Sequence, residues 1–207
     1  MAKRPTNDQI LIEEVVKQKH NQQSPEIEYP DYFEVFSAEQ ILKNQDLGYD
    51  ELLDGVIGGG RDGGIDYIYM FINGDYVRED YEFSLSKTKP TVDVFFGQVK
   101  TSKRYEETAI EKIKLFITDF MDLSIGQEGL AKKYNSDVVD KIVLFQTMVK
   151  ALASKFPRYR FQMAYVTMGD SPSDGLLNQA REAKFLAEKF ARDAVASFDL
   201  ILSLIHI

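Results

Sequence analysis

The chain of 207 residues contains neither cysteine nor tryptophan, and it has only two histidines. Without cysteine there can be no disulfide framework and no thiolate metal site, which fits a reducing cytoplasm. No Ser/His/Asp or Cys/His arrangement supports a nucleophilic hydrolase, and no P-loop lysine pattern is present. The sequence therefore predicts a cytoplasmic protein whose chemistry uses other groups.

Long hydrophobic runs are also missing. No stretch reaches the length of a membrane span, and the basic start of the chain is not followed by the apolar segment of a signal peptide. We therefore expect no membrane partner. A hydrophobic fraction of 44% is ordinary for a globular protein, and the length suits one α/β domain with a sizeable core.

Positive charge is scarce, because the net charge is −8. Residues 26–54 carry a net charge of −8, whereas residues 87–104 carry +4. Phosphate contacts need a basic footprint, so nucleic-acid binding over the whole surface is not expected, but a local track is. The residues predicted to contact phosphate are Lys87, Lys89, Lys103 and Arg104. A solvated loop and helix start would explain the same charges equally well.

The stretch from Gly58 to Lys100 organises the chain. A glycine-rich loop, residues 58–64, runs into a strand predicted over residues 65–72, and Asn73-Gly74 then forms a hairpin-type turn. A second strand is predicted over residues 92–100, with Gln98 and Lys100 on one face. Neighbouring strands thus offer the carboxylate of Asp66 together with an amide and an ammonium.

The glycine spacing at Gly58, Gly60 and Gly63 also matches the G-x-G-x-x-G dinucleotide pattern. That pattern requires a strand before it and a helix after it, so that the diphosphate lies at a helix N-terminus. Here a segment rich in β-branched and aromatic residues follows, which predicts a strand. The glycines more simply allow a sharp turn and a close approach to a ligand or metal.

Apolar periodicity predicts the remaining elements. Helices are expected over residues 8–20, from Asp31 to about Leu47 with Gly48 as the C-terminal stop, and over residues 101–122, 136–155 and 174–196. The first should begin with a capping box and bury one stripe, formed by Leu11, Ile12, Val15 and Val16. Thr101 or Ser102 should cap the third helix. Residues 160–167 should form a strand, and residues 124–135 a loop.

Two motifs resemble known families. Gly63–Asp66, followed on the next strand by Gln98–Lys100, resembles the PD-(D/E)XK nuclease superfamily in its Mrr-like variant, where glutamine replaces the second acid. Phe33–Phe36, Gly55–Tyr69 and Phe71–Gly74 are similar to the N-terminal region of the abortive infection phage resistance (AIPR) family. The resemblance implies an α/β fold with a restriction-endonuclease-like core, in which helices flank a mixed central sheet.

The resemblance also implies a function, a metal-dependent endonuclease that cleaves DNA rather than RNA in phage defence. Mg²⁺ or Mn²⁺ would be held by Asp66, Gln98, the main-chain carbonyl of Val99 and Glu34, while Lys100 would orient water or stabilise developing charge. Gln98 leaves this site one charge short, so a module that binds or assembles without cleaving is the alternative. The oligomeric state is open, a homo-oligomer included.

Each site residue has an ordinary structural alternative. Glu34 could bond back to a helix cap at Asp31, Asp66 could cap the glycine loop, and Lys100 could be a lysine at a strand end that keeps its ammonium in solvent. Asp62, four residues from Asp66 in the loop, could take its place as a ligand, but a strand fixes geometry better than a loop.

The last residues, 202–207, match what one reading frame of a sequencing-library adapter encodes, although an apolar strand is the alternative. We therefore expect residues 1–201 to be one nuclease-like domain from the N-terminal part of a longer protein, with the missing C-terminal region as a partner. His206 is then no ligand, and His20, a lone residue at a helix end, is expected on the surface.

Overall fold

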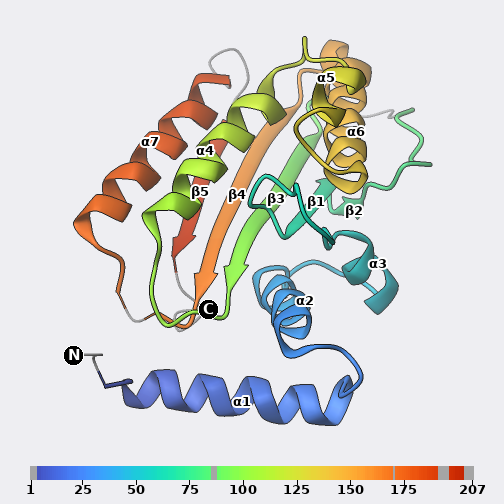
Figure 1. Ribbon diagram of the computed structural model, residues 1–207. Coiled ribbons are helices and arrows are strands. Elements are labelled where there is room, and N and C mark those ends of the chain that lie inside the picture. Colours follow the sequence, from blue (N-terminus) through green and yellow to red (C-terminus); the bar gives the residue numbers. More distant parts are fainter. Residues whose placement is uncertain (1–3, 85–87, 170, 191–195, 203–207) are drawn as a thin grey trace.

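The computed structural model describes residues 4–84, 88–169, 171–190 and 196–202, and Figure 1 shows how its elements are arranged. Its helices are α1 (Asn7–Gln23), α2 (Tyr29–Ile41), α3 (Tyr49–Asp54), α4 (Glu107–Met121), α5 (Gln127–Ala131), α6 (Ser136–Leu152), the 3₁₀ turn η1 (Ala153–Lys155) and α7 (Asp174–Phe190). Its strands are β1 (Tyr67–Ile72), β2 (Asp75–Tyr76), β3 (Thr91–Lys100), β4 (Arg158–Thr167) and β5 (Ala196–Leu202).

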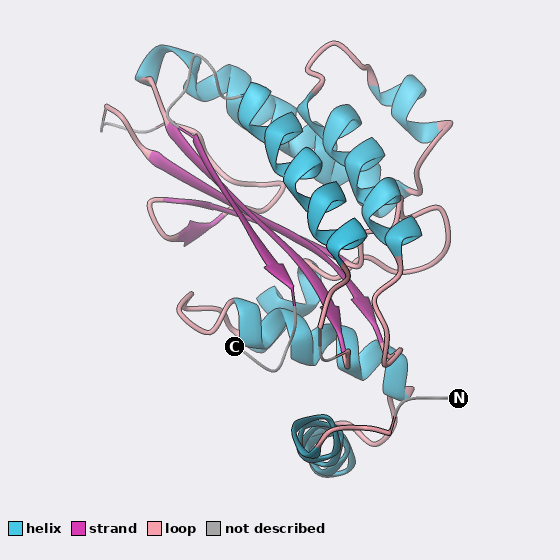
Figure 2. Cartoon of the chain, turned by 90° about the vertical axis from the view of Figure 1, so that its left-hand side faces the viewer, coloured by secondary structure: helices cyan, strands magenta, loops and turns pink. Residues whose placement is uncertain are grey.

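The strands form one mixed sheet in the order β2-β1-β3-β4-β5. β1 pairs antiparallel with β2 and β3, whereas β3, β4 and β5 run parallel to one another. Figure 2 shows helices on both sides of this sheet. Such covering is usual where parallel strands are joined by helical crossovers. The predicted fold class, an α/β protein with a mixed central sheet flanked by helices, is confirmed.

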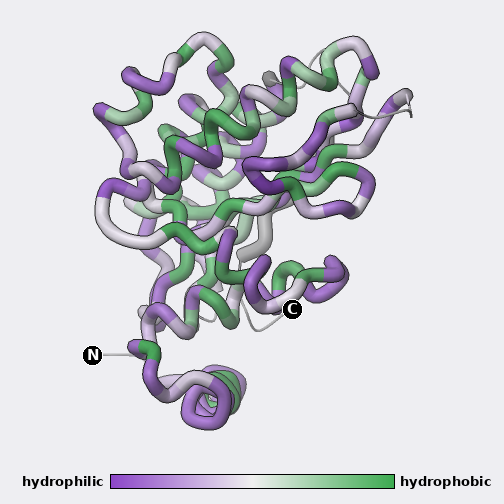
Figure 3. Tube along the Cα trace, turned by 90° about the vertical axis from the view of Figure 1, so that its right-hand side faces the viewer, coloured by the Kyte–Doolittle hydropathy of each residue, from purple (hydrophilic) through white to green (hydrophobic). Residues whose placement is uncertain are grey.

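Alternate residues of β1 face opposite helical layers, and every residue of this strand is buried. The odd-numbered side chains lie in an apolar cluster with residues of α2, and the even-numbered ones in a cluster with residues of α4 and α6. The first set is Tyr67, Tyr69 and Phe71, and the second is Ile68, Met70 and Ile72. Figure 3 shows hydrophobic stretches gathered in the interior and hydrophilic ones mainly outside.

Aromatic packing fixes α4 against β3. Phe96 of β3 lies 5.6 Å from Phe116 and 6.0 Å from Phe120 of α4, measured between ring centroids. Phe120 in turn stacks on Phe145 of α6, with centroids 4.3 Å apart. Aromatic pairs at these distances add to the stability gained by burying the rings. The end of β3 and the residues of α4 beside it are therefore held in fixed positions.

Helix α1 begins with the predicted capping box and lies across the end of the sheet where β3 and β4 terminate (Figure 1). Buried Gln9 donates from Nε2 to the carbonyl of Met168 at 2.8 Å. The predicted apolar stripe is partly wrong, because Val16 is buried but Leu11 and Val15 are 63% and 47% exposed. Two of the four residues of the predicted stripe are therefore exposed to solvent.

The helix predicted from Asp31 to about Leu47 is α2, which ends earlier, at Ile41, and α3 was not predicted. Glu28 is the N-cap of α2 and Pro30 lies in its first turn, so Asp31 is inside the helix and is not its cap. Gly48, predicted as a C-terminal stop, is instead the N-cap of α3 and donates its N–H to Glu51 at 2.9 Å. Glycine occurs at both kinds of helix end, which is why the prediction failed.

The predicted start of the next helix is also wrong, because α4 begins at Glu107 and neither Thr101 nor Ser102 caps it. The hydroxyl of Ser102 donates to the carbonyl of Arg104 at 2.7 Å. Its own carbonyl accepts from the N–H of Met168 at 3.0 Å. These bonds tie the segment after β3 to the end of β4, so it cannot continue into a helix.

Two further elements differ from the predictions. The expected loop over residues 124–135 contains α5, a helix too short to show a periodic pattern. Strand β5 pairs with β4 but was not predicted, and the helix expected over residues 174–196 overlaps only its first residue. Residues 203–207 of the predicted adapter segment lie outside the described residues. None of the helices described here has the length and apolarity needed to cross a membrane.

Candidate active site

The predicted catalytic strand residues meet where β1 begins and β3 ends. The two strands are antiparallel, with Tyr67 opposite Gly97. The residue just before β1 therefore lies beside the last residues of β3. That residue is Asp66, which lies just before β1 and not inside the strand as predicted. Gln98 and Lys100 follow Gly97 on β3 and share the sheet face that packs against α4. The structure therefore brings these three side chains to one end of the sheet.

Asp66 is held by the β3 backbone on both sides of Gln98. Its N–H donates to the carbonyl of Gly97 at 2.8 Å, and its Oδ2 accepts from the N–H of Val99 at 2.6 Å. Burial raises the pKa of Asp66 to about 6, and the hydrogen bond from Val99 and the charge of Lys100 oppose that rise. The carboxylate is mostly ionised at neutral pH, at a desolvation cost that a bound cation would relieve.

Gln98 offers an amide oxygen that the fold leaves unused. The side chain is 2% exposed, and its Oε1 has no hydrogen-bond partner among the described residues. An unpaired buried acceptor costs roughly 1 to 3 kcal/mol. A cation or a hydrogen-bond donor supplied by a ligand would remove that cost, so the orphan oxygen itself points to a binding position beside Asp66.

Glu34 of α2 reaches the same end of the sheet from the other helical layer. Burial, followed by the charges of Asp66 and Asp31, raises its pKa to about 8, while Lys100 acts in the opposite direction. Such coupling requires the groups to be close. The capping alternative is wrong, because Glu28 and not Asp31 is the N-cap of α2. Glu34 therefore lies near Asp66 and Lys100, and its role as a metal ligand stays a prediction.

Lys100, the last residue of β3, is half-buried and lies opposite Thr167 of β4. Its charge lowers the pKa of both Glu34 and Asp66, so its ammonium lies close to both carboxyls. The side chain of Val99 packs in the α2-side cluster while its N–H binds Asp66. A role for the Val99 carbonyl as a metal ligand stays a prediction.

The oxygen donors at this position fit a hard divalent cation. Asp66 and Glu34 supply carboxyl oxygens, and Gln98 supplies the unpaired amide oxygen. Among the described residues there is no group of three or more histidine, cysteine, aspartate or glutamate side chains that could hold a metal. Two carboxyls and an amide fall below that number, and the charge deficit expected from Gln98 stays a prediction. A cation here would have fewer charged ligands than a three-acid site provides.

The glycine loop has its own cap. Asp62 Oδ1 accepts from the N–H of Gly64 at 2.6 Å, so Asp62 closes this turn. The carboxylate of Asp66 binds the N–H of Val99 on β3 instead, so the capping alternative for Asp66 is wrong. Gly64 has φ +79°, and a Cβ there would lie 3.2 Å from Gln98 Nε2 and 3.0 Å from the Cβ of Lys112. The strand β1 follows this loop, which excludes the dinucleotide motif.

Asn135, which the sequence did not single out, holds the loop in place. Its Nδ2 donates to the carbonyls of Gly58 and Gly60 at 2.9 and 3.1 Å, and its N–H donates to the carbonyl of Arg61 at 2.9 Å. The same side chain caps α6, because Oδ1 accepts from the N–H of Val138 at 3.0 Å. An asparagine before a periodic segment signals the cap, but nothing in the sequence signals the loop contacts.

The basic residues predicted to contact phosphate do not form one track. Lys89 precedes β3 and Lys103 and Arg104 follow it, so the length of a ten-residue strand, about 30 Å, separates them. Lys103 is exposed and its Nζ lies 2.7 Å from Glu13 Oε2 of α1. Arg104 is exposed near the candidate site. Lys87 lies outside the described residues.

Comparison of the chain with family models, with curated proteins and with solved structures gave no significant match. The case for an active site therefore rests on the positions of these side chains and on the sequence motifs.

Proposed function

We propose that this chain is a nuclease domain that hydrolyses phosphodiester bonds with the help of Mg²⁺ or Mn²⁺. One observation carries the proposal: the buried carboxylate of Asp66 is fixed to the backbone on either side of Gln98, whose buried amide oxygen has no partner in the described structure. A pair of oxygen donors of this kind is costly for folding alone, so a ligand with positive charge accounts for both.

Hydrolysis forms a bond between a water oxygen and phosphorus, breaks the bond to the leaving oxygen, and transfers a proton to that oxygen. Asp66, Gln98 and Glu34 would hold the cation, which when bound neutralises charge on the phosphate oxygens. Lys100 stands on the same sheet face as Gln98, where its ammonium can orient the water and stabilise the charge that develops on phosphate. The buried strand positions keep these groups in register.

The substrate and setting follow from the resemblance alone. Similarity to the N-terminal region of the abortive infection phage resistance family favours DNA over RNA, cleavage inside the cytoplasm and a role in phage defence. The net charge of −8 also favours a substrate held at a local site over one bound across the whole surface.

A nuclease-like module without cleavage is the second candidate. The observation in its favour is the amide at Gln98, together with the finding that no three-acid metal group occurs among the described residues. Such a module would bind nucleic acid or assemble with other chains without hydrolysing a bond. The two candidates differ in one measurable property, which is metal-dependent cleavage.

The deciding experiment uses supercoiled plasmid with the purified protein and Mg²⁺ or Mn²⁺, with excess EDTA as the metal-free arm. We expect cleavage that EDTA abolishes and that Lys100→Ala lowers about 100-fold or more, the usual scale for a group acting on the attacking water. Lys150→Ala, at an exposed position on α6, is the matched control. If the metal has no effect, or if Lys100→Ala cleaves normally, the proposal is wrong.

Changing Gln98 to glutamate restores the carboxylate that the motif lacks. Calorimetric titration with Mn²⁺ should show affinity at least about tenfold tighter, since even indirect partners of metal ligands act on that scale. Gln127→Glu, which adds the same charge at an exposed position of α5, should change nothing. A folded Gln98→Glu protein with unaltered affinity would mean that Gln98 does not face the cation.

A further inference from the structure

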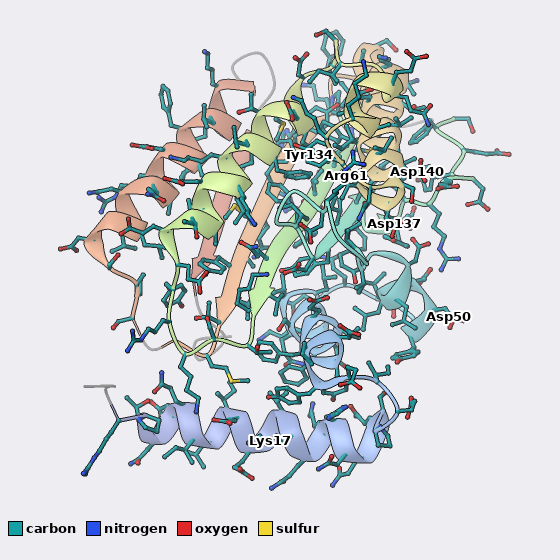
Figure 4. The ribbon with its side chains drawn as sticks, in the orientation of Figure 1. Lys17, Asp50, Arg61, Tyr134, Asp137 and Asp140 are labelled. Carbon is teal, nitrogen blue, oxygen red and sulfur yellow. The ribbon has the colours of Figure 1, made fainter. Side chains whose placement is uncertain are left out.

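A groove of about 540 Å³ adjoins the candidate site on the α4 side of the sheet. The glycine loop forms one wall with Arg61, Gly63 and Gly64, and α4 forms the other with Lys112 and Leu115. Tyr134 also lines it, and Figure 4 shows Arg61 and Tyr134 where the loop meets the segment before α6. A volume of this size suits a small polar ligand rather than a protein segment.

Gly64 joins the groove to the catalytic residues. A Cβ at this position would contact Gln98 Nε2 on one side, at 3.2 Å, and the Cβ of Lys112 on the other, at 3.0 Å. The same glycine also lines the groove, and the charge of Lys112 acts on the carboxylate of Asp66. Gly64 therefore lies between the groove and Gln98, one of the residues that would hold the cation.

Lys112 is the cation in the groove that is available for a ligand. Arg61 donates from Nη2 to the carbonyl of Ala131 at 2.7 Å, and Lys133 Nζ lies 2.8 Å from Asp119 Oδ1. Lys112, in contrast, is exposed and forms no hydrogen bond or ion pair with another described residue. In a chain of net charge −8, an unpaired ammonium beside a carboxylate site is placed to meet an anion.

The walls suit a planar group next to that anion. The glycine loop presents backbone without a side chain at partly exposed Gly63, and Leu115 opposite is 70% exposed. The loop is held by Asn135, so this surface exists before any ligand binds. A base can lie against such a surface, while the backbone phosphate of the same nucleotide reaches an ammonium.

We infer that this groove holds the nucleotide adjoining the phosphodiester that is cleaved, with Lys112 on its backbone phosphate. The inference rests on the proposed function for the identity of the ligand. It assigns a substrate-binding role to two residues that the sequence motifs did not include, Lys112 and Leu115, and adds such a role for Gly63. It also gives the glycine loop a role in ligand binding in addition to its role as a turn.

Two measurements on the metal-free protein test it. Titration of a fluorescein-labelled single-stranded DNA oligonucleotide, followed by anisotropy in EDTA, should show about threefold to tenfold weaker binding for Lys112→Gln and a salt slope reduced by about one. The matched control is Lys114→Gln, because Lys114 lies on the same helix but is paired with Glu182 at 2.8 Å. Addition of thymidine 5′-monophosphate should shift the amide NMR signals of Gly63 and Gly64.

The outcomes separate this inference from the nuclease proposal. Lys112-dependent binding without any plasmid cleavage would support the groove and refute the nuclease. Cleavage by a protein whose DNA affinity is unchanged in Lys112→Gln, with no signal shift at Gly63 and Gly64, would refute the groove and leave the nuclease standing. If inorganic phosphate produces the same shifts as the nucleotide, the groove does not hold the nucleoside and the inference is overturned.

Discussion

Replacing Asp66 with asparagine is expected to reduce metal-dependent cleavage below detection while leaving the protein folded. Asparagine keeps an oxygen that can accept from the N–H of Val99, a bond of 2.6 Å in the structure, so the backbone arrangement should survive. The lost charge, however, removes the ionised ligand from a donor set that already contains an amide in place of an acid. Plasmid cleavage and calorimetric Mn²⁺ titration should both show the loss.

The stability of this variant should move in the opposite direction. Burial raises the pKa of Asp66 from the ordinary value of 3.8 to about 6, so the folded state binds this proton more tightly than the unfolded state. Ionisation of Asp66 therefore removes stability as the pH rises from about 4 to 6, and that loss persists above pH 6. At pH 8 without metal, Asp66→Asn should unfold at the same temperature as the wild type or higher.

The control for both measurements is Asp50→Asn, the same chemical change at an exposed position of α3 that Figure 4 shows far from the strand ends. It should cleave and bind Mn²⁺ as the wild type does. Normal cleavage by Asp66→Asn would rule out a metal ligand at this residue. A much lower unfolding temperature at pH 8 would mean that the Asp66 carboxylate is a structural group whose charge the fold needs.

Gly97→Ala is expected to be severely destabilising, although it adds only a methyl group. A Cβ at this position would lie 2.3 Å from the hydroxyl oxygen of Tyr67 and 2.4 Å from its ring. Tyr67 is completely buried between the sheet and the α2 layer, so the ring has no free space to move into. Overpacking of this kind costs about 3 kcal/mol or more, which lowers the melting temperature by about 6 to 12 °C in a chain of this size.

The matched control for this change is Gly58→Ala. A Cβ at Gly58 would meet nothing within 4 Å, and the backbone there is not left-handed, so stability should change by less than about 0.5 kcal/mol. Combining Gly97→Ala with Tyr67→Leu should recover part of the lost stability, because the smaller leucine side chain leaves room for the added methyl group. Equal melting temperatures for Gly97→Ala and the wild type would show that the sheet can shift to admit the methyl group.

Much of the architecture could be predicted because it depends on local patterns of apolar and polar residues in the sequence. The aromatic and β-branched run of β1 and the alternation in β3 predict two strands, and antiparallel pairing then brings Asp66 to the end of β3. The positions of Gln98 and Lys100 follow from the same period of two. Errors occurred where one residue type serves two roles, as at Gly48, or where an element depends on distant pairing, as for β5.

The candidate site was less accessible than the fold. Glu34 could be selected only through the family resemblance, since its spacing from Asp31 also matches a helix cap. Asn135 binds the glycine loop and Lys112 lines the groove beside it, both across long sequence separations, and no local pattern records such proximity. The unpaired oxygen of Gln98 likewise depends on packing, because every glutamine looks the same in a sequence.

The contacts of Asn135 have a consequence for engineering. This single side chain caps α6 and binds two carbonyls of the loop between Gly58 and Gly64, so the start of the helix and the shape of the loop share one residue. A designer who transplanted the loop with β1 into another scaffold would leave its support behind. The smallest portable unit is the loop together with the first turn of α6, two segments that are far apart in the gene.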